Sequence, residues 1–191
     1  MPDGKSVLKI AYQSDRVKES DLGIKQNEKE VEISERESDN PLLARVLDWD
    51  EYGYKWIISE RVTPIDPNSD AFSEATGIPE DVFYELIGVY EKHRSEPDMN
   101  SEKLFKLFIE DKLTEMREKK TFEEKRPINA MIREVETYSE NANMVDTFDY
   151  LIDFINRNNL LAADIARIEH WGFDDSGQLK LYDYGAEAVL A

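Results

Sequence analysis

The chain has 191 residues and a mass of 22.2 kDa, enough for one sizeable core or two small lobes. Its 42 acidic residues against 24 basic ones give a formal charge of −18, which argues against non-specific binding to nucleic acid or to an anionic membrane. It has no cysteine, which excludes a disulfide framework and a thiolate metal site, and no apolar run approaches membrane-spanning length. We therefore expect a cytoplasmic protein whose partner is a protein, with a basic surface as one option.

The first third of the sequence predicts three strands and one helix. Residues 7–12 are largely apolar around Lys9 and are typical of a strand. Residues 23–37 are dense in helix-compatible side chains. Residues 43–47 and 54–62 predict two further strands, the second of which contains the β-branched and aromatic run Trp56-Ile57-Ile58. The order strand, helix, strand, strand predicts a small antiparallel sheet packed on the helix.

The middle of the sequence predicts a linker followed by four helices. Residues 63–69 contain two prolines, which stiffen a linker. Apolar residues then recur at the i, i+3, i+4 spacing that buries one face of a helix. The predicted helices cover residues 79–93, residues 101–116, a segment from residue 127 onward, and residues 144–158. These stripes favour core packing over cofactor contacts, and the charged residues 119–126 favour a solvated cluster between helices.

Residues 164–185 predict a β-hairpin followed by a carboxylate. Trp171 and Phe173 form a short apolar run, Asp174 to Gly177 has the composition of a tight turn, and residues 178–182 alternate polar and apolar. Asp183 follows this second strand. A carboxylate there suits a hard cation such as Mg²⁺, although a turn residue that caps a strand is the simpler interpretation.

The hairpin and the triplet Asp183-Tyr184-Gly185 resemble the catalytic and metal-binding region of the protein kinase-like fold, in which Asp-Phe-Gly follows the hairpin. In that family a catalytic aspartate precedes the hairpin, and Asp164 lies 19 residues before Asp183, close to the family spacing. The resemblance implies that Asp164 is the catalytic base and Asp183 a metal ligand. Glu169 stands where the family has an asparagine and becomes a second metal ligand. If the site is active, its cofactors are ATP and Mg²⁺.

The resemblance extends to the N-terminal strands. Lys9 matches the third-strand lysine of the family, which holds nucleotide phosphates and pairs with a helix glutamate, here Glu30. Glu60 and Val62 then belong to the hinge whose backbone hydrogen-bonds an adenine. Without this relation, Lys9 is an edge-strand lysine that reaches water, and Glu30 lies on a solvated acidic helix face.

Four short segments also resemble small degenerate kinase-like proteins of tailed bacteriophages. They are Leu8-Lys9-Ile10-Ala11, Gly23 with Gln26-Asn27 and Glu30, Trp171-Gly172, and Asp183-Tyr184-Gly185. The resemblance implies an α+β, kinase-like fold. Residues 1–62 form an N-lobe-like sheet with its helix, and residues 63–191 form a helical lobe that carries the hairpin.

The departures from the family bear on activity. Ala162 and Ala163 stand where kinases carry histidine and arginine. Eight residues precede Lys9 and six follow Gly185, so we expect neither a glycine-rich loop nor an activation segment in this chain. The same departures are also compatible with this chain being a fragment of a longer protein.

Three functions stay open. We favour a degenerate, pseudokinase-like protein, viral in origin, that acts as a binding or scaffold module for a host or viral protein. The second is an active ATP-dependent phosphotransferase with Asp164 as base and Asp183 on the metal. The third is an acidic decoy or nucleic-acid mimic that inhibits a basic partner. An unrelated α+β domain is also compatible with the sequence, but three agreeing spacings favour the kinase-like interpretation. We expect little or no phosphoryl transfer by this chain alone.

Overall fold

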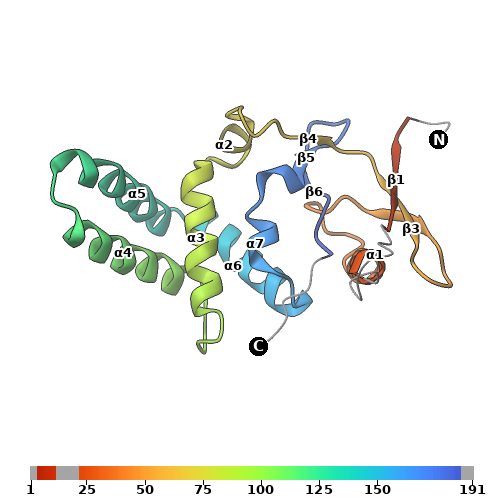
Figure 1. Ribbon diagram of the computed structural model, residues 1–191, viewed down its shortest axis with the longest axis horizontal. Helices are drawn as coiled ribbons and strands as arrows, with labels where there is room; N and C mark the ends of the chain where they lie inside the picture. The colour runs from red at the N-terminus through yellow and green to blue at the C-terminus, as the bar shows by residue number, and fades with distance from the viewer. Residues whose placement is uncertain (1–3, 12–21, 186–191) are drawn as a thin grey trace, which may run out of the picture. The chain divides into compact units, whose positions relative to one another are not determined.

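The computed structural model describes residues 4–11 and 22–185 (Figure 1), so Tyr12 of the first predicted strand lies outside the described residues. The fold is α+β, as the sequence predicted, with small antiparallel sheets and a larger number of helical residues. It divides into two compact units, one of Met1–Gly77 with Asn159–Ala191 and one of Ile78–Asn158. We call them the sheet unit and the helical unit.

The first sheet of the sheet unit has the predicted antiparallel arrangement, with the strand order β1-β3-β2. Its strands are β1 (Ser6–Ile10), β2 (Val46–Trp49) and β3 (Trp56–Glu60). The second strand in chain order was predicted from residue 43, but β2 begins only at Val46. The residues before it bond elsewhere, since Ala44 N donates to Leu181 O at 2.9 Å and Leu181 N donates to Leu42 O at 2.7 Å.

Helix α1 (Leu22–Arg36) packs against this sheet and matches the predicted helix to within one residue at each end. Its buried face includes Val31 and Ile33, and Ile57 in the central strand is also fully buried. Asn27 is buried as well, and its Nδ2 donates to Tyr54 O at 2.8 Å, which satisfies a carbonyl in the turn before β3.

The second sheet joins the predicted linker to the C-terminal hairpin. It has the order β4-β5-β6, with β4 (Thr63–Pro64), β5 (Trp171–Phe173) and β6 (Leu179–Leu181). The hairpin was predicted, and Gly177 takes the positive φ of 83° that its turn requires. The pairing of β4 was not predicted. A Cβ on Gly172 would lie 2.3 Å from the backbone oxygen of Thr63, so glycine permits this close approach.

Because β4 pairs with β5, the division of the chain differs from the predicted boundary between residues 62 and 63. Residues 63–77 and the hairpin belong to the sheet unit, and the helical unit is an insertion between them. The predicted linker also runs into a short helix, α2 (Ala71–Thr76), which ends at Gly77 in the left-handed conformation. Two more short elements, α7 (Ala162–Ile165) and a 3₁₀ turn (Ile168–His170), precede β5.

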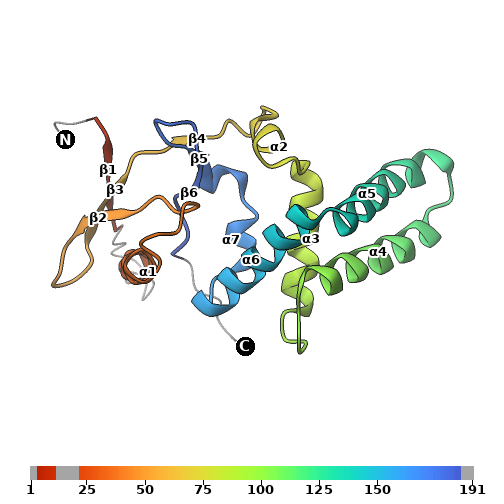
Figure 2. The same ribbon diagram turned by 180° about the vertical axis from the view of Figure 1, so that it is seen from behind.

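The helical unit contains the four predicted helices, and α4 and α5 run side by side (Figure 2). Its core is aromatic: Phe105 meets Phe148 edge to face at 5.2 Å and Tyr138 at 6.4 Å between ring centroids. The helices are α3 (Glu80–His93), α4 (Ser101–Glu118), α5 (Phe122–Glu140) and α6 (Ala142–Asn158).

Helix α5 begins earlier than Pro127, where the sequence placed its start. Thr121 and Glu124 form a reciprocal capping box, with Thr121 N donating to Glu124 Oε2 at 2.8 Å and Glu124 N donating to Thr121 Oγ1 at 3.3 Å. The charged residues 123–126 are therefore helical rather than a cluster between helices. Pro127 lies inside the helix. Among the described residues, none of the helices combines the length and the apolar character of a membrane span.

Candidate functional site

Lys9 lies at the centre of a charged cluster in the sheet unit. In β1 it pairs with Ile57 of β3, so its side chain shares the sheet face with that buried residue. Its ammonium nitrogen lies 2.6 Å from Glu30 Oε1 on α1 and 2.8 Å from Asp183 Oδ1, just after β6. The sequence predicted this meeting of three residues, and the structure brings them together.

Glu30 is the most deeply buried member of the cluster. It projects from α1 beside Val31, and only 2% of its side chain is exposed. Burial disfavours its charged form and the nearby Asp183 carboxylate repels it, while Lys9 favours ionisation. Burial prevails and raises the pKa of Glu30 to about 7. The solvated acidic face that was the alternative interpretation of Glu30 is thus wrong.

Asp183 accepts hydrogen bonds on one of its carboxylate oxygens, and its other oxygen lies near a histidine. Oδ1 accepts hydrogen bonds from Lys9 and from Gln26 Nε2, each at 2.8 Å. His170 Nε2 lies 3.6 Å from Oδ2. Partial burial alone would raise the pKa of Asp183, but the charge and hydrogen bond of Lys9, together with His170, hold it below its usual range.

The charges of the cluster follow from these neighbours. Burial opposes the charge on Lys9, yet attraction to Glu30 and Asp183 outweighs it and raises the pKa of the ammonium. Lys9 and Asp183 are therefore ionised at neutral pH, and Glu30 exchanges a proton there. With Glu30 ionised, one ammonium faces two carboxylates and the three groups carry a net charge of −1.

The backbone after β6 is fixed against α1 and against the segment before β2. Tyr184 is buried, and its hydroxyl donates to Ala44 O at 3.1 Å. A Cβ on Gly185 would lie 2.2 Å from Gln26 O and 2.8 Å from Glu30 Cγ, so any larger residue would displace α1. The triplet Asp183-Tyr184-Gly185 thus holds the carboxylate against the helix that carries Glu30.

Asp164 and Glu169, the predicted base and second metal ligand, both bond to Arg167, whose guanidinium is also attracted by the charge of Asp183. Asp164 is in the short helix α7, and its backbone oxygen accepts from Arg167 N at 3.3 Å. Glu169 Oε1 accepts from two nitrogens of Arg167, at 2.9 and 3.0 Å, and about half of the Glu169 side chain is exposed. No hydrogen bond or ion pair joins either carboxylate to Lys9 or Asp183 within the described residues.

Glu60 and Val62, the predicted hinge residues, lie at the end of β3 and just after it. Glu60 N donates to Arg45 O at 2.8 Å, so this amide is already bonded within the protein. The Glu60 carboxylate faces Arg45, with 3.9 Å between Oε2 and Nε. Val62 packs closely on Gly172, where an added Cβ would lie 2.5 Å from Val62 Cγ1. A role of either residue in binding adenine stays a prediction.

A divalent metal is the cofactor that the kinase-like resemblance implies besides ATP. The described residues do not fit it well. Asp183 is bonded to Lys9 and Gln26, and Glu169 is bonded to Arg167. Across residues 4–11 and 22–185 there is no group of three or more histidine, aspartate or glutamate side chains placed to hold a metal ion. Lys9 supplies the positive charge next to Asp183.

Gln26 and His170 are members of the cluster whose contacts the sequence analysis did not predict. Gln26 lies one turn before Glu30 on α1, and this i, i+4 spacing was a usable signal that the two share a helix face. Nothing in the sequence points from His170 to Asp183. The His170 side chain is only 9% exposed, and its Nδ1 is buried without a partner among the described residues.

Comparisons with protein-family models, with curated proteins and with solved structures find no match to this chain. The kinase-like resemblance stays a hypothesis drawn from the sequence.

Proposed function

We propose that the protein is a kinase-like binding module, a pseudokinase in which Lys9 offers a cation to a phosphate-containing ligand and phosphoryl transfer is absent or very weak. The observation that supports this is the contact of Lys9 with both Glu30 and Asp183. An unrelated α+β domain has no need to join these three positions, whereas the kinase-like resemblance implies all of them. The module would serve as a scaffold for a host or viral protein in the cytoplasm, the compartment that the absence of cysteine favours.

The geometry argues against efficient phosphoryl transfer, which depends on positioning and on neutralising charge. Asp183 Oδ1 already accepts hydrogen bonds from Lys9 and Gln26, and Glu169 is paired with Arg167. Ala163 stands where kinases have the arginine that braces the catalytic loop. The parts that would bind a phosphate are therefore better preserved than the parts that would transfer it.

A phosphate that binds Lys9 must compete with two carboxylates. With Glu30 ionised, the net negative cluster repels an anion, and with Glu30 protonated the ammonium is available at lower cost. We therefore expect a phosphate ligand to bind more tightly at pH 6 than at pH 8.

The second candidate, an active phosphotransferase with Asp164 as base, uses the same contact of Lys9 with Glu30 and Asp183 and is also supported by the spacing of Asp164 and Asp183. The departures at Ala163 and Glu169 favour the pseudokinase over it. The third, an acidic decoy for a basic protein, is supported by the formal charge of −18 and does not draw on this contact.

A thermal-shift titration with ATP, with and without Mg²⁺, tests the proposal. A ligand that binds the native state raises its stability by about 2.7 kcal/mol at a concentration 100 times its Kd. We expect ATP to raise the Tm of the unaltered chain without requiring Mg²⁺, and Lys9→Met to abolish the shift. Lys25→Met, an exposed lysine on α1, is the matched control and should keep it. A chain whose Tm does not respond to ATP at either pH would refute a nucleotide ligand.

Incubation with γ-labelled ATP, Mg²⁺ or Mn²⁺, and a cell lysate separates the pseudokinase from the phosphotransferase. We expect no transfer of label above background. Transfer that disappears in the Asp183→Ala variant would instead establish the phosphotransferase.

A further inference from the structure

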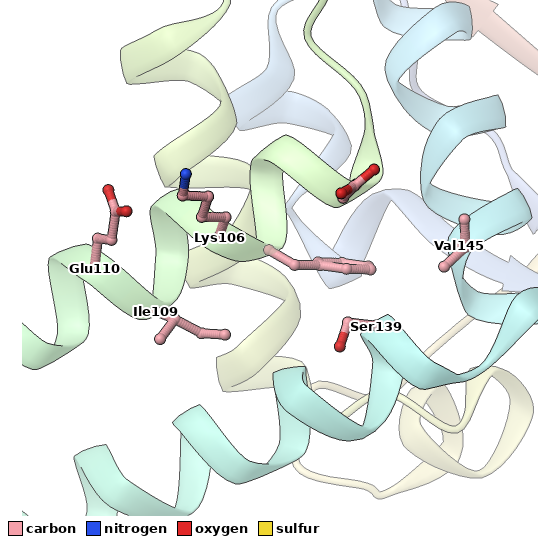
Figure 3. Close-up of a pocket in the computed structure, with 7 residues that line it drawn as sticks. Lys106, Ile109, Glu110, Ser139 and Val145 are labelled. Atoms are coloured by element: carbon pink, nitrogen blue, oxygen red, sulfur yellow. The ribbon is translucent and has the colours of Figure 1, made fainter.

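The helical unit contains a pocket of about 650 Å³ between α4, α5 and α6 (Figure 3). This lies within the range of about 300–1,000 Å³ that is typical of ligand sites. Most of the lining comes from one stripe of α4, with Ser139 of α5 and Val145 of α6 completing it. The α4 residues are Glu102, Phe105, Lys106, Ile109 and Glu110.

The floor of the pocket is apolar and firmly held. Phe105 is only 1% exposed, and its ring is packed on Phe148 and Tyr138. Ile109 and Val145 are half-buried and add aliphatic surface on either side. The floor can thus receive apolar side chains without first rearranging the core.

The rim of the pocket is charged, and its charged side chains are unpaired among the described residues. Glu102, Lys106 and Glu110 follow one another at four-residue intervals on α4, and all three are exposed. None of the three side chains makes an ion pair or hydrogen bond in the part of the chain that the structure describes. Two carboxylates around one ammonium leave the rim with a net charge of −1, on a chain whose formal charge is −18. A cationic ligand is therefore favoured over an anionic one.

We propose that this pocket is a docking groove for a basic amphipathic helix of a partner protein. Glu102 and Glu110 lie eight residues apart, about 12 Å along α4. A partner helix with basic residues about two turns apart can pair with both while apolar residues between them contact Ile109 and Val145. Lys106, midway between the two glutamates, disfavours a helix that is basic along its whole length. The groove uses no residue of the Lys9 cluster, so its test is independent of the proposed nucleotide site.

The probe is a fluorescent, amidated peptide of about 18 residues, roughly 27 Å as a helix, in which leucines form one face and lysines recur every two turns. Its controls are a scrambled peptide of the same composition and a peptide with glutamate in place of lysine. Binding is followed by fluorescence anisotropy at physiological salt. We expect the patterned lysine peptide to bind at least about tenfold more tightly than either control.

Charge reversal tests whether the binding is at the pocket. The double variant Glu102→Lys/Glu110→Lys should weaken the patterned peptide by at least about tenfold. The matched control, Asp39→Lys/Glu51→Lys, makes the same change in net charge at exposed positions of the sheet unit and should alter the affinity less than about twofold. Ile109→Ser should also weaken binding, because it removes apolar surface from the floor of the pocket. Circular dichroism checks that this variant keeps its helicity.

Several results would overturn the proposal. Equal losses in the two double variants would mean that the peptide responds only to net charge. Equal binding of the scrambled peptide would show that the groove does not recognise an amphipathic helix. Tighter binding of the glutamate peptide would show that the groove prefers an acidic partner. Absence of binding by the patterned peptide would exclude the groove as a site for basic helices.

Discussion

In the helical unit, Phe105 is packed against Phe148 and Tyr138, all on helices that follow one another along the chain. In the sheet unit, distant segments are joined by an ion pair instead: Lys9 contacts Asp183, 174 residues away in the sequence. Apolar contacts are non-directional and tolerate adjustment, whereas an ion pair at a half-buried site depends on distance, burial and protonation state. We therefore expect the stability of the helical unit to depend on volume, and that of the sheet unit to depend on charge and pH.

The chain offers a separate optical probe for each unit. All three tryptophans, Trp49, Trp56 and Trp171, belong to the sheet unit, so tryptophan fluorescence reports its unfolding. Helices α3 to α6 belong to the helical unit and contain most of the helical residues, so they dominate far-ultraviolet circular dichroism. Urea unfolding followed by both signals can distinguish the two units in each variant below.

The largest effect is expected from Phe148→Ala. The side chain is 1% exposed and packs edge to face on Phe105, so its removal leaves a cavity in the helical core. We expect a loss of about 3–5 kcal/mol in the free energy of unfolding, measured by circular dichroism. The loss should be independent of pH between 5 and 8. A fluorescence transition that moves by the same amount would show that the two units unfold together and would remove the contrast between them.

Lys9→Met should be nearly as damaging at pH 8, by about 3 kcal/mol, because it leaves Glu30 buried with no cation. In the unaltered chain Glu30 already stays protonated up to its pKa of about 7, so its ionisation separates the two chains only above that pH, where the folded variant must still hold the proton. The loss should therefore shrink towards pH 5. A deficit that is the same at pH 5 and pH 8, by fluorescence, would show that Lys9 acts through packing alone.

Glu30→Gln should have the opposite effect on stability as the pH rises. The folded-state pKa of Glu30, about 7, exceeds the ordinary 4.5, so the folded chain binds more protons between these values and loses stability as the pH rises through them. Glutamine cannot ionise and removes that decline. We expect the stability of the variant, relative to the unaltered chain, to increase between pH 5 and pH 8 by roughly 1–3 kcal/mol. A difference that stays flat over this range would mean that Glu30 is ionised throughout.

The smallest changes in stability are expected from alanine substitutions at two glycines, and they should have opposite signs. Gly172→Ala places a Cβ 2.3 Å from Thr63 O, so strands β4 and β5 must separate, and we expect a loss of about 1–3 kcal/mol by fluorescence. Gly88→Ala, at an exposed position in the middle of α3 with no atom near the new Cβ, should instead gain about 0.5–1 kcal/mol by circular dichroism. If Gly172→Ala is neutral, the tight pairing of β4 with β5 is not required.

The local elements of this protein could be predicted from its amino-acid sequence. The i, i+3, i+4 apolar spacing located the four long helices, and the turn from Asp174 to Gly177 located the hairpin, because these features depend on neighbours within a few residues. The start of α5 was missed because Pro127 suggested a helix start, while the capping box at Thr121 and Glu124 had already begun the helix.

The assembly of the sheet unit, in contrast, depends on contacts between segments far apart in the chain. The kinase-like resemblance predicted the contact of Lys9 with Glu30 and Asp183. It did not predict that Gln26 and His170 lie beside Asp183. It also did not predict the ion pair between Glu169 and Arg167. The added strand β4 and the pKa of Glu30 were likewise outside the reach of local patterns. Burial and Coulomb energy depend on every group that folding brings near, and here those groups come from opposite ends of the chain.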